Sequence, residues 1–162
     1  MPNVATFLRK DTSIVKIESI PLDIMKKYRQ LKRTDKEAGG IILGRMIQNS
    51  HDVIIDQITV PAVHDRRSRF SFFRSRFIQT YINLKWHTSE HTQNYLGEWH
   101  THPEPHPLPS GTDIKNWQEV LHKSVIDQEF LIFLIVGQVT ISAWELCKLD
   151  TVLYQLRPGD QT

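Results

Sequence analysis

The residue types best suited to catalysis in this sequence are gathered in the segment EWHTHPEPHPLPSGTD, residues 98–113. His100 and His102 are two residues apart in a stretch with strand character, so both imidazole rings project from the same face. Two imidazoles side by side supply half of a tetrahedral zinc site. Because such pairs also occur on ordinary exposed strands, the two histidines indicate a metal site only together with a third ligand.

Asp113 is the candidate for that third ligand. It follows His102 across the loop PEPHPLPSG, in which four prolines in nine residues exclude both helix and strand. A bent loop can return the carboxylate to the two imidazoles. Three protein ligands leave one coordination position open, and water held there has its pKa lowered to about 7, which indicates a catalytic rather than a structural site.

Other residues near this segment have simpler interpretations. Ser110 and Asp113 have the spacing of a capping box, and a capped helix start is also a rigid place to mount a ligand. His87 and His91 have the i, i+4 spacing of a helix face but no matched third ligand, so we expect no metal there. His106 lies among prolines and is expected to be exposed.

A general base is the remaining requirement of such a site. Glu37 opens the segment EAGGIILGR, whose glycines allow the backbone to pass close to other elements. A carboxylate beside an activated water can take its proton and pass it to a leaving amine. Spacing alone leaves Glu98 and Glu104 as alternatives, because both are closer to the histidines in sequence.

Composition indicates what class of protein carries these residues. The chain has 162 residues and 19.0 kDa, with 40% hydrophobic and 23% charged residues, so we expect one globular domain over residues 1–162. The longest apolar run is seven residues, whereas a membrane helix needs about 20. The first ten residues lack the apolar core of a signal peptide, and Cys147 has no cysteine partner in the chain. We therefore expect a cytoplasmic protein. Cys147 itself is a poor candidate nucleophile, because interior thiols are usually inert.

The elements that position these residues can be read from hydrophobic periodicity. Strands are predicted at 6–10, 13–20, 38–47, 52–60, 94–102, 130–137, 139–146 and 151–157. Helices are predicted from Ser19, from Phe77, and over 112–123. The first helix would use Leu22, Ile24, Met25, Tyr28 and Leu31 as its apolar face, the second Phe77, Ile78, Tyr81 and Leu84, and the third Ile114, Trp117 and Leu121. The order predicts a mixed-sheet α/β fold of three layers, with FLIFLIV inside the sheet and covered on both faces.

Glu37, His100-Thr-His102-Pro and Ser110-x-x-Asp113 together resemble the signature of the JAMM (JAB/MPN+) zinc metalloproteases. That signature is an upstream Glu, His-x-His, ten residues and Asp, and residues 103–112 supply the ten. The resemblance covers about Thr34 to Leu146 and implies a fold similar to that of cytidine deaminases. It implies that His100, His102 and Asp113 hold one Zn²⁺ per chain. It further implies that Glu37 is the general acid/base and that Ser110 bonds the oxyanion.

The same resemblance implies a substrate class. The family typically cuts isopeptide bonds between the C-terminus of ubiquitin or a ubiquitin-like protein and a lysine. GEWHTHPEPHPLPSGTD and DRRSRFSFFR are most similar to the JAB deconjugases of bacterial CBASS anti-phage operons. Their implied substrate is a cGAS-like nucleotidyltransferase that an E1/E2-like ligase has joined to a target. Alternatives are a deconjugase of another ubiquitin-like protein, or a non-catalytic MPN interaction module. The His-Asn-His-Pro-Ser-Gly motif typical of RadC-type JAB proteins is absent, which disfavours that group.

A basic and aromatic stretch, RRSRFSFFRSR at 66–76, precedes the second predicted helix. One interpretation is a strand with inward phenylalanines and solvated arginines. Another is a rail for an extended substrate tail that adds as an edge strand and contacts Arg67, Arg69, Arg74 and Arg76. Arginines among aromatics also suit nucleic acids, but a net charge of only +2 disfavours that reading.

Overall fold

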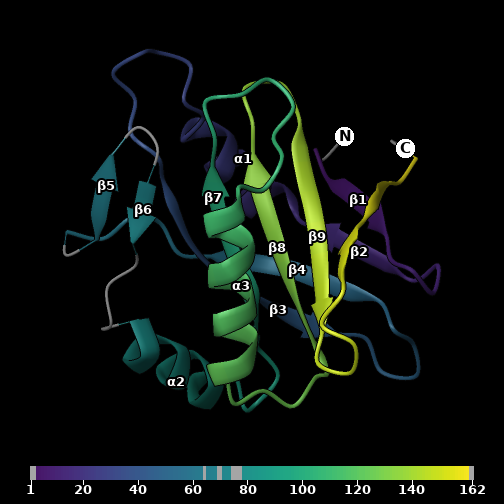
Figure 1. Cartoon of the computed structure of the whole chain (residues 1–162). Helices are drawn as coiled ribbons and strands as arrows, with labels where there is room; N and C mark the ends of the chain where they lie inside the picture. Colours follow the sequence, from purple (N-terminus) through teal and green to yellow (C-terminus); the bar gives the residue numbers. More distant parts are fainter. Residues whose placement is uncertain (1–2, 64, 69–70, 74–77, 161–162) are drawn as a thin grey trace.

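A computed structural model describes residues 3–160 apart from 64, 69–70 and 74–77. Within this part of the chain the strands are β1 (Ala5–Leu8), β2 (Ile14–Ile17), β3 (Gly39–Met46), β4 (Val53–Ile58), β5 (Arg66–Ser68), β6 (Ser71–Phe73), β7 (Asn94–Thr101), β8 (Phe130–Val136), β9 (Ile141–Cys147), β10 (Leu153–Gln155) and β11 (Arg157–Pro158). The helices are α1 (Ser19–Lys27), α2 (Ile78–Thr88) and α3 (Gly111–Lys123). One mixed sheet has the order β10-β9-β8-β7-β3-β4-β2-β1-β11, and β5 and β6 form a separate hairpin (Figure 1).

β8 shows why helices cover both faces of this sheet. Its side chains alternate between two cores, because successive residues of a strand point to opposite faces. Leu131, Phe133 and Ile135 pack with Trp117 and Leu121 of α3. The intervening residues of β8 join the core that contains Leu22 and Met25 of α1; they are Ile132, Leu134 and Val136. The predicted three-layer α/β arrangement, with this strand buried on both faces, is confirmed.

β7 lies between β3 and β8 and carries the candidate site. It runs parallel to β8 and antiparallel to β3, with His100 opposite Gly39. The register shifts between Ile42 and Leu43, and Gly97 near this point has φ +147°, a conformation that side chains rarely adopt. A Cβ at Gly97 would also overlap the carbonyl oxygen of Ile132. Glycine is therefore required where β7 pairs with Ile132 of β8.

The two ends of the sheet are joined by the last segment of the chain. β10 pairs with β9 at one end, and β11 pairs with β1 at the other. The sequence predicts a single strand over 151–157, which is wrong, because Leu156 leaves β10 and donates its N–H to the carbonyl of Ala143. Arg9, just after β1, also forms an ion pair with Glu145 of β9 at 2.8 Å. The sheet thus curls until its first and last strands meet.

The helix ends differ from the sequence prediction. α1 stops at Lys27, so Leu31 is 66% exposed rather than part of the apolar face. Ser19 is the first helical residue, and Glu18 precedes it without a side-chain cap. Leu84 of α2 is also exposed, at 57%. These errors lie at ends and surfaces, where packing does not enforce the pattern.

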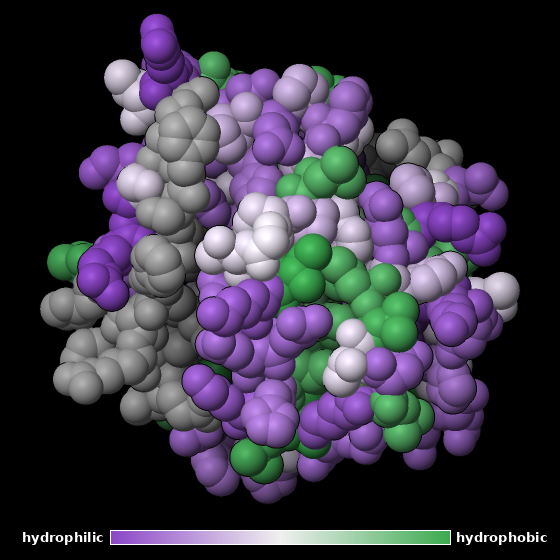
Figure 2. Space-filling model, in the orientation of Figure 1, coloured by the Kyte–Doolittle hydropathy of each residue, from purple (hydrophilic) through white to green (hydrophobic). Residues whose placement is uncertain are grey.

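The surface is mainly polar on the face that carries α3. Apolar side chains gather there between α3 and β9 (Figure 2). Among the described residues, none of the helices combines the length and the apolar character that crossing a membrane requires.

Candidate metal centre

The end of β7 and the start of α3 bring the three predicted ligands together. The Nε2 atoms of His100 and His102 lie 3.0 Å apart. Asp113 faces both rings, with Oδ1 at 3.3 Å from His100 Nε2 and Oδ2 at 3.2 Å from His102 Nε2. Both histidines are 8% exposed, so the cluster is screened from bulk water.

These distances fit a zinc ion. Ligand atoms about 2 Å from a tetrahedral zinc lie about 3.3 Å from one another, close to the 3.0–3.3 Å found here. Two imidazole nitrogens and a carboxylate are also a donor set that zinc prefers in catalytic sites. The residues therefore fit the metal that the sequence predicts.

Asp113 is held in place by the capping box at the start of α3, as the spacing predicts. Asp113 N–H donates to Ser110 Oγ at 3.1 Å, and Ser110 N–H donates to Asp113 Oδ2 at 2.8 Å. Burial acts to raise the pKa of Asp113, but hydrogen bonds from His100 and His102 outweigh it and hold the pKa below its ordinary value. The Asp113 carboxylate is thus ionised and held in place before a metal ion binds.

His102 is tuned by the same contact. Burial acts to lower the pKa of His102, while its bond with Asp113 raises the pKa above the ordinary 6.5. The second ring nitrogen of His102, Nδ1, is buried without a hydrogen-bond partner. Glu104 Oε1 lies 4.0 Å from this atom.

Glu37 lies just before β3, and its carboxylate is within 4.8 Å of ligand atoms of both imidazoles. Its Oε1 is 3.9 Å from His100 Nε2, and the residue is 5% exposed. Burial raises the pKa of Glu37 to about 7, against the lowering effect of His100 and His102. A carboxyl group of this kind can exchange a proton near neutral pH.

The alternative bases are less well placed. Glu98 Oε1 accepts a hydrogen bond from Tyr95 Oη at 3.4 Å. Glu104 is half-exposed and lies beside Nδ1 of His102, away from the Nε2 atoms that converge on the centre. The geometry favours Glu37.

Other predicted residues lie apart from the cluster. His87 and His91 contact each other edge to face, with ring centroids 5.5 Å apart, but the described His, Cys, Asp and Glu residues supply no metal group there. His106 is exposed and contacts Thr140 Oγ1 at 3.2 Å. Burial, followed by Glu145, raises the pKa of Cys147 to about 11, so this thiol is a poor nucleophile at neutral pH.

Of the four arginines predicted to contact a substrate tail, the structure describes Arg67. Arg67 is half-buried in β5, and its Nε donates to the backbone carbonyl of Glu37 at 2.9 Å. Arg69, Arg74 and Arg76 lie outside the described residues.

Sequence reasoning missed Thr101 and Gln30. Thr101, between the two histidines, accepts the N–H of Ala38 on its side-chain oxygen at 2.9 Å. It donates to Gln30 Oε1, also at 2.9 Å. The alternation of a strand indicates that Thr101 points away from the metal side, but nothing in the sequence singles out Gln30.

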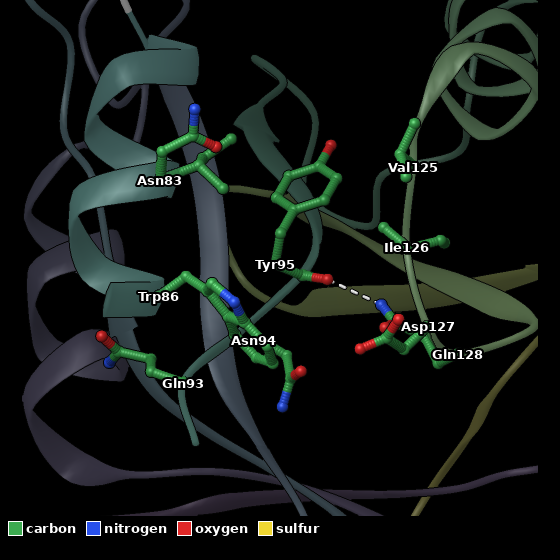
Figure 3. Close-up of a pocket in the computed structure, with 10 residues that line it drawn as sticks. Asn83, Trp86, Gln93, Asn94, Tyr95, Val125, Ile126, Asp127 and Gln128 are labelled. Atoms are coloured by element: carbon green, nitrogen blue, oxygen red, sulfur yellow. Dashed lines mark hydrogen bonds between the residues drawn. The ribbon is translucent and has the colours of Figure 1, made fainter. Parts of the chain in front are cut away.

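A cleft of about 230 Å³ lies between α2 and the segment after α3, and Figure 3 shows ten of the residues that line it. It contains none of the candidate catalytic residues. Gln128 Nε2 donates there to the backbone carbonyl of Tyr95 at 2.6 Å.

Comparison with known proteins finds a family and several relatives that are similar to this chain. The family described as prokaryotic homologues of the JAB domain matches residues 24–147. A protein of Pseudomonas aeruginosa named CD-NTase/cGAS isopeptidase is 38% identical over 72% of this chain and 73% of its own length. Proteins with the same name are 37% identical in Vibrio cholerae, over 68% of each chain, and 36% identical in Escherichia coli, over 78% of each chain.

A solved structure supports the fold alone. The solution structure of protein DSY2949 from Desulfitobacterium hafniense has a TM-score of 0.60 to this chain, at 18% identity. The match covers 87% of this chain and 88% of the other.

Proposed function

Since the chain belongs to the family of prokaryotic homologues of the JAB domain, we propose that it is a zinc-dependent isopeptidase. One observation carries the proposal: His100, His102 and Asp113 converge within 3.3 Å, with Glu37 3.9 Å from His100. The names of the relatives support the same class of reaction.

His100, His102 and Asp113 would hold one zinc ion per chain. When bound, zinc supplies a Lewis acid that polarises the scissile carbonyl and lowers the pKa of water. The partly buried carboxylate of Asp113 contacts both His100 and His102 and would keep their rings oriented for that task.

Glu37 would move the proton. Its carboxylate accepts a proton from the attacking water, whose oxygen bonds to the carbonyl carbon. The carbon–nitrogen bond then breaks, and Glu37 returns the proton to the leaving lysine amine. A buried carboxyl group this close to His100 can serve in both halves of the transfer.

Ser110 would stabilise the oxyanion. Its Oγ already accepts the N–H of Asp113, so its own hydroxyl proton is left to donate outward. The residue is exposed and can reach a bound substrate.

The substrate we propose is a protein conjugated through its C-terminus, specifically a cGAS-like nucleotidyltransferase joined to a target during anti-phage defence. The similarity to three proteins named CD-NTase/cGAS isopeptidase supports this choice. The cognate E1/E2-like ligase would be a second partner. Arg67, with the arginines at 69, 74 and 76, would contact the extended tail. We further propose that residues 1–162 act as one domain in the cytoplasm.

The test uses the purified chain with one equivalent of zinc. Its substrate is a cGAS-like nucleotidyltransferase from the same genome, fused through its C-terminus to a folded reporter. We expect cleavage directly after the C-terminus, its loss with a chelator, and its return with zinc. Cleavage only of a ubiquitin-like fusion would overturn the substrate. No cleavage of either fusion would overturn the enzyme and favour an interaction module.

A further inference from the structure

A buried polar chain connects the end of α1 to the residue after Glu37. Gln30 and Thr101 are both 0% exposed. Gln30 Nε2 donates to the carbonyl of Asp35 at 3.2 Å, and Gln30 Oε1 accepts from the Thr101 hydroxyl at 2.9 Å. Thr101 Oγ1 in turn accepts the N–H of Ala38 at 2.9 Å.

The direction of these bonds is fixed by Gln30. Its amide nitrogen is committed to Asp35, so its amide oxygen faces Thr101. A threonine hydroxyl has a single proton and two lone pairs. Because that proton points to Gln30, the lone pairs of Thr101 remain free to accept the Ala38 N–H.

This arrangement holds Ala38 by both of its backbone groups. Its N–H donates to the side chain of Thr101, and its carbonyl accepts the Thr101 N–H at 2.9 Å. The neighbouring backbone groups of Glu37 are also bonded, with its N–H donating to the carbonyl of Ser68 and its carbonyl accepting from Arg67. The backbone from which the Glu37 side chain reaches His100 is therefore held in place.

We propose that Gln30 is a positioning residue, which acts through the Thr101 hydroxyl and the Ala38 N–H to place the Glu37 carboxylate beside His100. The proposal rests on the proposed function, in which Glu37 moves the proton. Gln30 lies outside the metal cluster and would not touch substrate.

The first test replaces Gln30 with methionine, which keeps the volume but removes both hydrogen bonds. We expect kcat on the nucleotidyltransferase fusion to fall about 10- to 100-fold, as small misplacements of a catalytic group do, with KM and zinc content nearly unchanged. Gln128→Met is the matched control. Gln128 is also buried, and its side chain donates to the backbone carbonyl of Tyr95, at the opposite end of β7 from Thr101 (Figure 3). The Gln128→Met variant should keep kcat.

The second test asks whether Gln30 acts through Glu37. In a Glu37→Gln background the Gln30→Met change should lower the residual kcat less than about twofold, because coupled residues are non-additive. An equal fall in both backgrounds would show a general structural effect and overturn the proposal. Thr101→Ser should retain kcat, whereas Thr101→Val should lower it like Gln30→Met.

A third measurement needs no activity. Hydrogen exchange of the Ala38 amide should speed up at least about tenfold in Gln30→Met and Thr101→Val, but not in Gln128→Met. Unchanged Ala38 protection would overturn the positioning role even if kcat fell. If the wild-type chain cuts no fusion while Ala38 exchange responds as expected, the proposed function fails and the hydrogen-bond chain to Glu37 stands.

Discussion

Asp113 combines two tasks that local geometry makes compatible. Its Oδ2 accepts the Ser110 N–H, which closes the capping box, and the same carboxylate faces His100 and His102. A helix start is electropositive, so an ionised acid is favoured there before a metal adds to the charge. The ligand is consequently preorganised by the element that carries it.

Removal of one imidazole tests the ligand set. His102→Ala should lose zinc and turnover together, because two remaining ligands bind zinc poorly. The fold should persist, since the two cores are formed by other residues. Elemental analysis and circular dichroism measure the two effects, and a full equivalent of zinc in this variant would contradict the assignment.

Glu37→Gln should separate metal binding from proton transfer. Zinc should remain near one equivalent, since the three ligands are intact. Turnover should fall by roughly two to four decades, the usual effect of removing a positioned acid/base. Single-turnover kinetics on the fusion measure this loss, and near-normal turnover would move the role to Glu98 or Glu104.

The same variant has a second consequence in the chelator-treated protein. Folded Glu37 has a pKa of about 7 against an ordinary 4.5, so between these values the unfolded chain binds fewer protons and stability falls as pH rises. Glutamine removes that loss. Glu37→Gln should thus match the wild type below pH 4.5 and exceed it at pH 8, by about 3 kcal/mol. Urea unfolding across pH measures the gap. Glu104→Gln, at a half-exposed carboxylate, is the control, and a constant gap would contradict the argument.

At the scale of elements, local pattern predicts what packing enforces. β8 and α3 are apparent from sequence because their side chains fill the cores. The candidate metal ligands can be proposed from sequence because His100-x-His102 and Ser110-x-x-Asp113 are short patterns. The split of 151–157 into β10 and β11 was not predictable, since it depends on pairing with strands at opposite ends of the sheet. Gln30 was not predictable for the same reason, because its partner Thr101 is 71 residues away.

Gly97 tests how closely β7 and β8 must approach. Gly97→Ala would place a methyl group against the Ile132 carbonyl in a backbone conformation unfavourable to alanine. We expect a loss of unfolding free energy of about 3 kcal/mol or more, from overpacking and backbone strain together. Gly111→Ala is the control, because its Cβ would meet nothing within 4 Å and it opens α3. Urea unfolding measures both, and equal effects would contradict the packing argument.

At the scale of the whole molecule, the family resemblance drawn from five residues is confirmed by a match over residues 24–147. The similarity to proteins named CD-NTase/cGAS isopeptidase is confirmed by relatives that are 36–38% identical to this chain over 68–78% of its length. Outside the motif, the sheet closes on itself through contacts between its first and last strands.

The ion pair of Arg9 and Glu145 is a polar contact between β9 and the residue that follows β1. Arg9 donates Nε and Nη2 to the two carboxylate oxygens at 2.8 and 2.9 Å, and its guanidinium lies 4.0 Å from the Phe130 ring centroid. The side chains of the pair are only 8% and 7% exposed. Removal of one partner therefore leaves a buried charge without compensation.

Arg9→Met should accordingly lower the free energy of unfolding by about 3–5 kcal/mol. The double change Arg9→Met with Glu145→Leu should recover part of that loss, because no charge is then stranded between the strands. Arg45 and Asp56 provide the matched control, with the same donor atom at 3.0 Å but with Arg45 54% exposed, and this pair should couple by less than about 1 kcal/mol. Double-mutant cycles in urea at low and high salt measure both couplings. Equal couplings, or a buried coupling that salt abolishes, would mean that the ends of the sheet are held together by apolar packing and backbone bonds rather than by this pair.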